Sequence, residues 1–339
     1  MKAQSRSVAL GVNLLLAALA ILLTFGLLEL FVRSFVTVRD VGPAFTAYDP
    51  VYGKRLKANL HATRIAPEFR FEINTNSLGM RDPEPTKPLT DGIVFVGDSF
   101  TMGYGVKDNE AFPALVRAGL ENRGVTRPVL NTGMGDNGNG RWVKFFDNDA
   151  ARFRPGIVVL QVMANDFDDN LAERLYELDA SDRLHALPIG PPGLGRKVQA
   201  LIEDVPGLSN SYLVGLASVA ARSMTADRSD IPTGSEPDYD PASDALTFTL
   251  VRTAIEKART TGADVIGLLV GLSGQRRAKM RAIFEEQGLT CLDGPNQKDA
   301  PDLFFNVDGH WNAAGHRRAA ALLLPEILRH LEQPRHAAE

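Results

Sequence analysis

The chain reads Ile93-Val94-Phe95-Val96-Gly97-Asp98-Ser99-Phe100-Thr101 in its first third. Four apolar residues in succession predict a strand that is buried on both faces, because a half-exposed strand would alternate apolar with polar residues. The glycine and polar residues after it predict a turn into a helix, and helix-spaced apolar residues follow at 112–120. Strand, polar turn and helix in this order form the repeating unit of a parallel sheet.

The same alternation recurs along the chain. Further strand-like runs lie at 129–131, 156–163, 264–270 and 289–292, and a second helical pattern lies at 246–258. Because the strands are apolar on both faces, helices must cover both sides of the sheet. We therefore predict an α/β fold, a doubly wound, three-layer parallel sheet.

Changes in composition divide the chain into an N-terminal anchor at 1–35, a connecting segment at 36–88 and a main domain at 89–335. The end of the connecting segment, 82–88, carries three prolines, which forbid regular structure and indicate a linker. Within the main domain the alternation lapses at about 171–243, where prolines and polar residues indicate an insertion. Partial helices are expected in this insertion around 198–202 and 212–221.

Residues 8–28 are apolar apart from Asn13 and Thr24, and about twenty apolar residues suffice to cross a bilayer as a helix. We predict one uncleaved transmembrane helix. The alternative is a signal peptide, whose apolar region is about half as long and ends in a small-residue cleavage site, whereas Glu29 and Arg33 follow here. Basic residues flank both ends, so the orientation is weakly determined. We prefer a single-pass membrane protein with its main domain on the periplasmic or extracellular side.

The overall charge is nearly balanced, with 37 Lys and Arg against 41 Asp and Glu. This balance gives no reason to expect a nucleic-acid partner. Cys291 is the only cysteine, so an intrachain disulfide is impossible, and its apolar neighbours indicate a buried core thiol.

Functional side chains of a doubly wound sheet gather at the carboxyl ends of the strands. Ser99 follows the first core strand at the expected start of a helix, where its hydroxyl could act as a nucleophile. Alternatively, Asp98 and Ser99 merely cap that helix. Thr101 excludes the Gly-x-Ser-x-Gly nucleophile elbow, which requires glycine at this position.

Asn165 ends the third strand and has two interpretations. Its amide could donate to an oxyanion, which is a large electrostatic contribution to acyl transfer, or it could be an ordinary turn residue. The acids that follow, Asp166, Asp168 and Asp169, are interpreted as a solvated loop rather than a cation site.

His310 and Asp308 lie on one loop near the C-terminus, just before the last expected helix. A serine nucleophile needs a base within hydrogen-bond reach, and the base needs an acceptor that fixes its tautomer. His310 with Asp308 could supply both. A metal site formed by His310 and His316 is disfavoured, because six residues of helix would place them on different faces and a third ligand is not evident.

Taken in order, these motifs resemble the SGNH/GDSL hydrolase superfamily from about residue 74 to about residue 331. The residues that carry the resemblance are Gly97-Asp98-Ser99-Phe100-Thr101, Asn131 with Gly133 and Gly135, Asn165-Asp166, and Asp308-Gly309-His310-Trp311-Asn312-Ala313-Ala314-Gly315-His316. The upstream run 74–81 is similar to a segment of bacterial membrane-anchored members. The insertion is not covered by the resemblance.

The resemblance implies a flavodoxin-like sandwich, Ser99 as nucleophile and His310 as general base, with neither cofactor nor metal. It also implies an oxyanion hole formed by the backbone N–H of Ser99, a backbone N–H of Gly135 or Asp136, and the Asn165 side chain. Two positions depart from the common pattern. Asp308 lies two residues before the histidine instead of three, as in the acyltransferase-like branch, and Asp136 stands where glycine is frequent.

Two other patterns have competing interpretations. The run 133–138 matches the dinucleotide fingerprint G-x-G-x-x-G, but it follows the second core strand instead of the first. Nucleotide binding would also not explain the motifs around Ser99 and His310. The basic run Arg276, Arg277, Lys279 and Arg281 indicates a solvated helix face.

The sequence thus predicts a serine esterase that acts on an O-acyl ester, in a small molecule or a glycan, through an acyl-enzyme. The alternatives are an O-acyltransferase or deacetylase on an envelope polysaccharide, and an inactive glycan-binding module. Neither the acyl length nor the oligomeric state can be inferred from the sequence.

Overall fold

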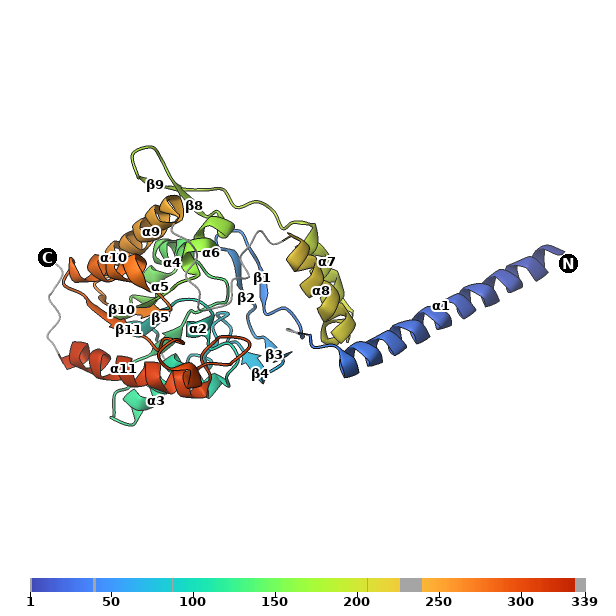
Figure 1. The fold of residues 1–339 in the computed structure, drawn as a ribbon, viewed down its shortest axis with the longest axis horizontal. Helices are drawn as coiled ribbons and strands as arrows, with labels where there is room; N and C mark the ends of the chain where they lie inside the picture. Colours follow the sequence, from blue (N-terminus) through green and yellow to red (C-terminus); the bar gives the residue numbers. More distant parts are fainter. Residues whose placement is uncertain (1, 39–40, 87, 206, 226–239, 333–339) are drawn as a thin grey trace.

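A five-stranded parallel sheet runs through the centre of the main domain in the computed structural model (Figure 1). The structure describes residues 2–38, 41–86, 88–205, 207–225 and 240–332. The strands are β5 (Ile93–Val96), β6 (Val129–Asn131), β7 (Ile157–Met163), β10 (Asp264–Val270) and β11 (Thr290–Asp293). Their order, β11-β10-β7-β5-β6, places the strand before Ser99 next to the sheet edge and confirms the predicted doubly wound fold.

Helices cover both faces of this sheet, as strands that are buried on both faces require. One face packs against α3 (Phe112–Glu121) and α11 (Ala313–Glu332). The other packs against α4 (Gly140–Asn148), α5 (Ala150–Phe153), α9 (Pro241–Thr260) and α10 (Gly274–Glu285). In β5, Ile93 and Phe95 belong to the first layer, while Val94 and Val96 belong to the second. The alternation of side chains along a strand therefore builds both cores.

Two antiparallel hairpins precede the sheet: β1 (Thr46–Asp49) with β2 (Gly53–Leu56), and β3 (His61–Ile65) with β4 (Arg70–Asn74). The segment after them was predicted to be a linker, and that prediction is wrong for its first residue. The Asp82 side chain is only 6% exposed, accepts a hydrogen bond from the backbone N–H of Asn131 and pairs with Arg117. The prolines that follow Asp82 disfavour regular structure, but they do not prevent Asp82 from bonding to the sheet.

The insertion contains more structure than the sequence pattern indicated. It holds a hairpin, β8 (Tyr176–Leu178) with β9 (Leu184–Ala186), and two helices, α7 (Leu194–Asp204) and α8 (Tyr212–Thr225). The helices include the predicted stretches 198–202 and 212–221 and extend beyond them. In Figure 1 the two helices lie apart from the sheet, and α8 contacts the end of the N-terminal helix.

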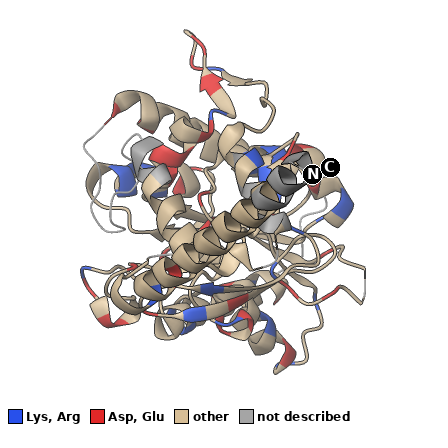
Figure 2. Ribbon diagram, turned by 90° about the vertical axis from the view of Figure 1, so that its right-hand side faces the viewer, with Lys and Arg blue, Asp and Glu red and all other residues tan. Residues whose placement is uncertain are grey.

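That N-terminal helix, α1 (Lys2–Phe35), projects from the rest of the protein (Figure 1). Seen from its own side in Figure 2, it is almost free of charged residues over most of its drawn length. Residues 10–35 are long and apolar enough to span a membrane, and few of them are buried. The predicted single apolar N-terminal helix is thus present, and packing in a soluble core does not explain its composition.

Candidate active site

Ser99 opens the short helix α2 (Ser99–Met102) directly after β5. The backbone N–H of Phe100 donates to Asp98 Oδ1 at 2.8 Å, so Asp98 caps this helix. Gly97 leaves no space for a side chain, because Thr101 and Gln161 lie where a Cβ would project. The cap interpretation therefore holds for Asp98, and the Ser99 hydroxyl contacts a partner from elsewhere in the chain.

That partner is His310, on the loop before α11. His310 Nε2 lies 2.7 Å from Ser99 Oγ, and His310 Nδ1 lies 2.5 Å from Asp308 Oδ1. The imidazole packs against the rings of Phe100 and Tyr104, with centroid distances of 4.9 and 5.0 Å. Carboxylate, imidazole and hydroxyl thus form one continuous hydrogen-bonded chain, the arrangement that allows an imidazole to take a proton from a serine.

The loop that carries His310 is held by the segment between β3 and β4. Glu68 accepts hydrogen bonds from three consecutive backbone N–H groups at 2.7 to 2.8 Å, those of Asn306, Val307 and Asp308. Next to it, the ring of Phe69 lies 4.5 Å from that of Phe305. Both contacts fix the backbone on which Asp308 and His310 stand.

His316, the partner of His310 in the disfavoured metal-site interpretation, is a buried residue that accepts a backbone hydrogen bond. It is fully buried, and its Nδ1 accepts from the backbone N–H of Phe112 at 3.3 Å. Burial lowers the pKa of His316 to about 3, so the ring is neutral at physiological pH. Among the residues that the structure describes, no group of three or more His, Cys, Asp or Glu side chains could hold a metal ion.

The turn after β6 lies against Ser99. A Cβ built on Gly135 would be 3.8 Å from Ser99 Cβ, and the Asn137 side chain donates to the carbonyl oxygen of Gly97 at 2.8 Å. Asp136 has a φ of 48°, in the left-handed region that favours glycine. A glycine would adopt this conformation at a lower cost than the aspartate does. The turn thus brings Gly135 close to the serine, and the part of Gly135 or Asp136 in an oxyanion hole stays a prediction.

Two glycines of the apparent dinucleotide fingerprint are explained by packing. A side chain on Gly133 would collide with the backbone of Thr101 and Met102, and one on Gly138 would collide with Asn170. These glycines allow the turn to approach α2 and the helix that contains Asn170 closely. Their spacing therefore has a structural cause within the serine site.

Asn165 stands at the start of α6 (Asp166–Glu173), after β7. Its Nδ2 donates to Asp169 Oδ2 at 3.0 Å, while its buried Oδ1 has no hydrogen-bond partner among the described residues. The prediction of a solvated acidic loop is wrong, because the acids form the first turn of this helix. Asp166 is fully buried and accepts from the backbone of Met163 at 3.0 Å and from Asn139 at 2.8 Å.

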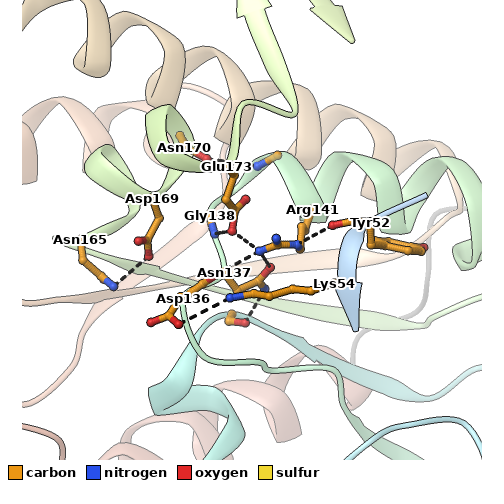
Figure 3. A network of polar contacts seen from close by, with 12 residues as sticks. Tyr52, Lys54, Asp136, Asn137, Gly138, Arg141, Asn165, Asp169, Asn170 and Glu173 are labelled. Carbon is orange, nitrogen blue, oxygen red and sulfur yellow. Dashed lines mark hydrogen bonds and ion pairs between the residues drawn. The ribbon is translucent and has the colours of Figure 1, made fainter. Parts of the chain in front are cut away.

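A network of charges surrounds this amide (Figure 3). Lys54, on β2, lies with its Nζ 3.5 Å from Asp136 Oδ2; its side chain is only 13% exposed, whereas that of Asp136 is 92% exposed. Behind them, Arg141 pairs with Glu173, and both side chains are buried. The lysine charge lowers the pKa of Asp136, while burial, and then the charges of Asp136 and Glu173, raise the pKa of Asp169 to about 8. Asp169 is therefore largely protonated at neutral pH.

Asp98 belongs to the same electrostatic environment. Burial raises the pKa of Asp98 to about 6, although its hydrogen bond from Phe100 and the nearby His310 act in the opposite direction. This buried carboxyl group therefore takes up a proton more readily than a free one, but it stays mostly ionised at neutral pH and keeps its capping role.

The basic run on α10 differs from its prediction in one residue. Arg276 is buried, pairs with Asp244 at 2.7 Å and lies over the ring of Phe167, 4.2 Å from its centroid. This ion pair joins α10 to α9. The contact of Arg276 with Phe167 joins α10 to the helix that begins after Asn165. Arg277 and Arg281 instead pair with Asp293 nearer the surface.

Three residues near the site were missed by reasoning from sequence: Lys54, Glu68 and Asp169. Asp169 had a readable signal, because a residue four positions after Asn165 shares its face once the segment is helical. Lys54 and Glu68 belong to the hairpins upstream of the sheet. Local sequence patterns do not predict which residue of a hairpin will contact a loop that is distant in the sequence.

The fold and the site together define an ester hydrolase of the α/β type. Residues 95–318 match the model of the GDSL-like lipase/acylhydrolase family, and because this is more than half of the chain, the chain belongs to that family. It is an enzyme that acts on ester bonds. Among curated proteins, no sequence matches the chain significantly.

Several solved structures are similar in fold to this chain. A psychrotrophic esterase from Pseudoalteromonas sp. is 13% identical, with 72% of this chain and 100% of that chain covered and a TM-score of 0.42. An acetylxylan esterase from Geobacillus stearothermophilus is 13% identical, with 74% and 97% covered and a TM-score of 0.37. A GDSL-like lipase from Bacteroides thetaiotaomicron is 12% identical, with 72% and 91% covered and a TM-score of 0.36. Such low values transfer neither substrate nor site residues to this chain.

Proposed function

We propose that the protein is a serine esterase that cleaves an O-acyl ester through a covalent acyl-enzyme. His310 takes the proton of Ser99 Oγ as that oxygen attacks the ester carbonyl carbon. The tetrahedral intermediate then collapses, and the alcohol leaves with the proton that His310 returns. Water, activated by the same imidazole, attacks the acyl-enzyme and releases the carboxylic acid and free Ser99. Asp308 holds the imidazole in the tautomer that accepts at Nε2.

The negative charge of the tetrahedral intermediate would be received on the opposite side of Ser99. The proposed donors are the backbone N–H of Ser99, the backbone N–H of Gly135 or Asp136, and Nδ2 of Asn165. The amide of Asn165 is held by Asp169 at 3.0 Å, so the substrate oxygen competes with, or shares, that donor. Fixed donors of this kind typically contribute roughly 3–4 kcal/mol each to the transition state.

The observation that carries the proposal is the chain of hydrogen bonds from Asp308 through His310 to Ser99 Oγ, at 2.5 and 2.7 Å. It is tested by treating the full-length protein with an activated aryl ester and with a fluorophosphonate probe. We expect Ser99→Ala to lower ester turnover by about 10³-fold or more and to abolish labelling. Ser181→Ala, at an exposed turn, is the matched control and should behave as wild type. Equal labelling or turnover in Ser99→Ala would contradict the proposal, and a wild type without either would favour a binding module.

A second candidate is de-esterification or O-acyl transfer on an envelope polysaccharide. The exposed carboxylate of Asp136, held next to the serine by Lys54, favours it, because carboxylates readily accept hydrogen bonds from sugar hydroxyls. Incubation with acetylated glycan separates the outcomes: free acetate indicates hydrolysis, and acetyl groups on an added glycan acceptor indicate transfer.

We also infer that α1 anchors the enzyme in a membrane as a single span, with the catalytic domain on the periplasmic or extracellular side. A cleaved signal peptide would leave the folded domain without its N-terminal helix. Here the end of that helix packs on the folded domain, where Val32 and Val41 are buried against Tyr212 and Leu213. This contact supports a helix that remains part of the mature protein.

A further inference from the structure

Helix α7, in the insertion, has an apolar face that nothing in the described structure covers. Its members are Leu194, Val198 and Leu201 together with Val205, which follows the last residue of the helix; they are 78, 44, 67 and 47% exposed. Successive spacings of four, three and four residues place them on one side of a helix. A helix of a soluble domain normally turns such a stripe toward the core, so this face is expected to have a partner outside the described chain.

The neighbouring helix α8 is fastened to the end of α1. Glu29 accepts hydrogen bonds from Ser211 Oγ at 2.7 Å and from the backbone N–H groups of Tyr212 and Leu213 at 2.9 Å, so a residue of α1 caps α8. The guanidinium of Arg33 lies over the ring of Tyr212, 4.7 Å from its centroid. These contacts tie the position of α8 to the last turns of α1, and the turn at 208–210, which contacts both helices, links α7 to α8.

The position of these contacts along α1 indicates where α7 and α8 lie relative to the membrane. Glu29 and Arg33 are the first charged residues after the apolar stretch, and charged residues at the end of a membrane helix lie at the interface with water. The pair α7–α8 therefore starts at the level of the lipid headgroups. In Figure 1 it lies across the end of α1, between that helix and the sheet.

We propose that α7 is an interfacial helix that lies on the phospholipid bilayer, with Leu194, Val198, Leu201 and Val205 inserted among the upper acyl chains. This inference rests on the proposed membrane anchoring by α1. An amphipathic helix next to a span is suited to this position, because its apolar stripe enters the lipid while its other side stays in water. The insertion then holds the catalytic domain at a fixed height and tilt above the membrane.

The test uses the full-length protein in vesicles of phosphatidylcholine and phosphatidylglycerol. A nitroxide spin label is attached to Leu201→Cys, on the apolar face, and to Ala200→Cys, an exposed position on the other side of the helix. Cys291 is buried, and burial raises the pKa of its thiol to about 12, so the wild-type chain serves as the labelling blank. Collision rates with oxygen, which dissolves in lipid, are compared with those of a water-soluble nickel complex.

We expect the ratio of oxygen to nickel accessibility to be several-fold higher for Leu201→Cys than for Ala200→Cys. Equal ratios, with both labels open to the nickel complex, would overturn the proposal. Spin–spin broadening at position 201 would also overturn it, because it would show that a second copy covers the face. A label immobilised and shielded from both reagents would overturn it in favour of packing against protein.

A label on Leu19→Cys, in the middle of α1, separates this inference from the proposals on which it rests. If that label lies within the bilayer while position 201 is in water, the proposed membrane span is supported and the proposed interfacial position of α7 is contradicted. If position 19 is itself accessible to the nickel complex, the anchor fails first. Fluorophosphonate labelling of Ser99 in the same vesicles reports on the catalytic proposal independently of both.

Discussion

The two sides of Ser99 are built in different ways. On one side, His310 is hydrogen-bonded to Asp308 and packs against the rings of Phe100 and Tyr104. On the other side, the amide of Asn165 lies in a network of acids and bases contributed by several segments (Figure 3). The histidine side is therefore held by packing and one short hydrogen bond, and the amide side by balanced charges.

This difference follows from what each side has to do. An imidazole that accepts a proton needs one fixed orientation and a nearby carboxylate for the cation that forms. A donor to an oxyanion needs a fixed dipole whose own neighbours do not repel the new negative charge. The acids near Asn165 would do so if all were ionised, and the raised pKa of Asp169 together with the charges of Lys54 and Arg141 limits that repulsion.

The largest effect in this comparison is expected on the histidine side. Asp308→Asn places an amide where the carboxylate accepts from His310 Nδ1, and an amide N–H can favour the wrong tautomer. We expect kcat for an aryl ester to fall by about 10²- to 10⁴-fold with the fold retained. Asp302→Asn, at an exposed position before the same loop, is the control. An unchanged kcat would mean that the backbone alone orients the imidazole.

Removing the amide donor should have a somewhat smaller effect. We expect Asn165→Ala to lower kcat by about 10²- to 10³-fold while KM changes little, because an oxyanion donor acts mainly in the transition state. The control is Asn148→Ala, which removes an exposed amide on α4. If KM rises and kcat is unchanged, Asn165 binds the substrate and the backbone N–H groups form the hole by themselves.

The smallest effect concerns stability and not turnover. Asp169 has its pKa raised to about 8 in the folded protein, so its protonated form stabilises the fold. That contribution is complete below about pH 4, the pKa of an unfolded Asp, and is lost as pH rises through 8. Asp169→Asn cannot ionise and should avoid the loss.

We therefore expect the melting temperature of wild type, relative to Asp169→Asn, to be lower at about pH 9 than at about pH 5, by roughly 2–4 °C for each kcal/mol that the ionisation of Asp169 costs. Thermal unfolding of both proteins at the two pH values measures this difference. Asp299→Asn, at an exposed turn, should follow wild type. A constant difference between wild type and Asp169→Asn across this pH range would show that Asp169 does not ionise differently in the folded state.

The connecting segment at 36–88 has a larger part in the site than its sequence suggested. It contributes Lys54 to the amide side and Glu68 to the histidine side, although the family match begins only at residue 95. Both sides of the proposed catalytic centre thus depend on hairpins outside the matched region. A domain boundary placed at 88 or 89 would separate these two residues from the groups that they contact.

Local patterns in the sequence were enough for the sheet, the two helical layers and the apolar N-terminal helix. Periodicity and turn residues report interactions between near neighbours, and these decide which segments become strands and helices. The motifs around Ser99 and His310 were also readable, because the chemistry of a nucleophile and a base restricts which residues stand at strand ends.

Only the tertiary structure decided that Asp98 and not Ser99 caps α2. It also decided that Asp169 accepts a hydrogen bond from the Asn165 amide and that Arg276 is buried. It also decided that Glu68 holds the histidine loop and that the apolar face of α7 stays uncovered beside α1. Each of these features depends on contacts or burial between segments far apart in the sequence. The free energy of such contacts is set by the packing of the whole chain, which local periodicity does not encode.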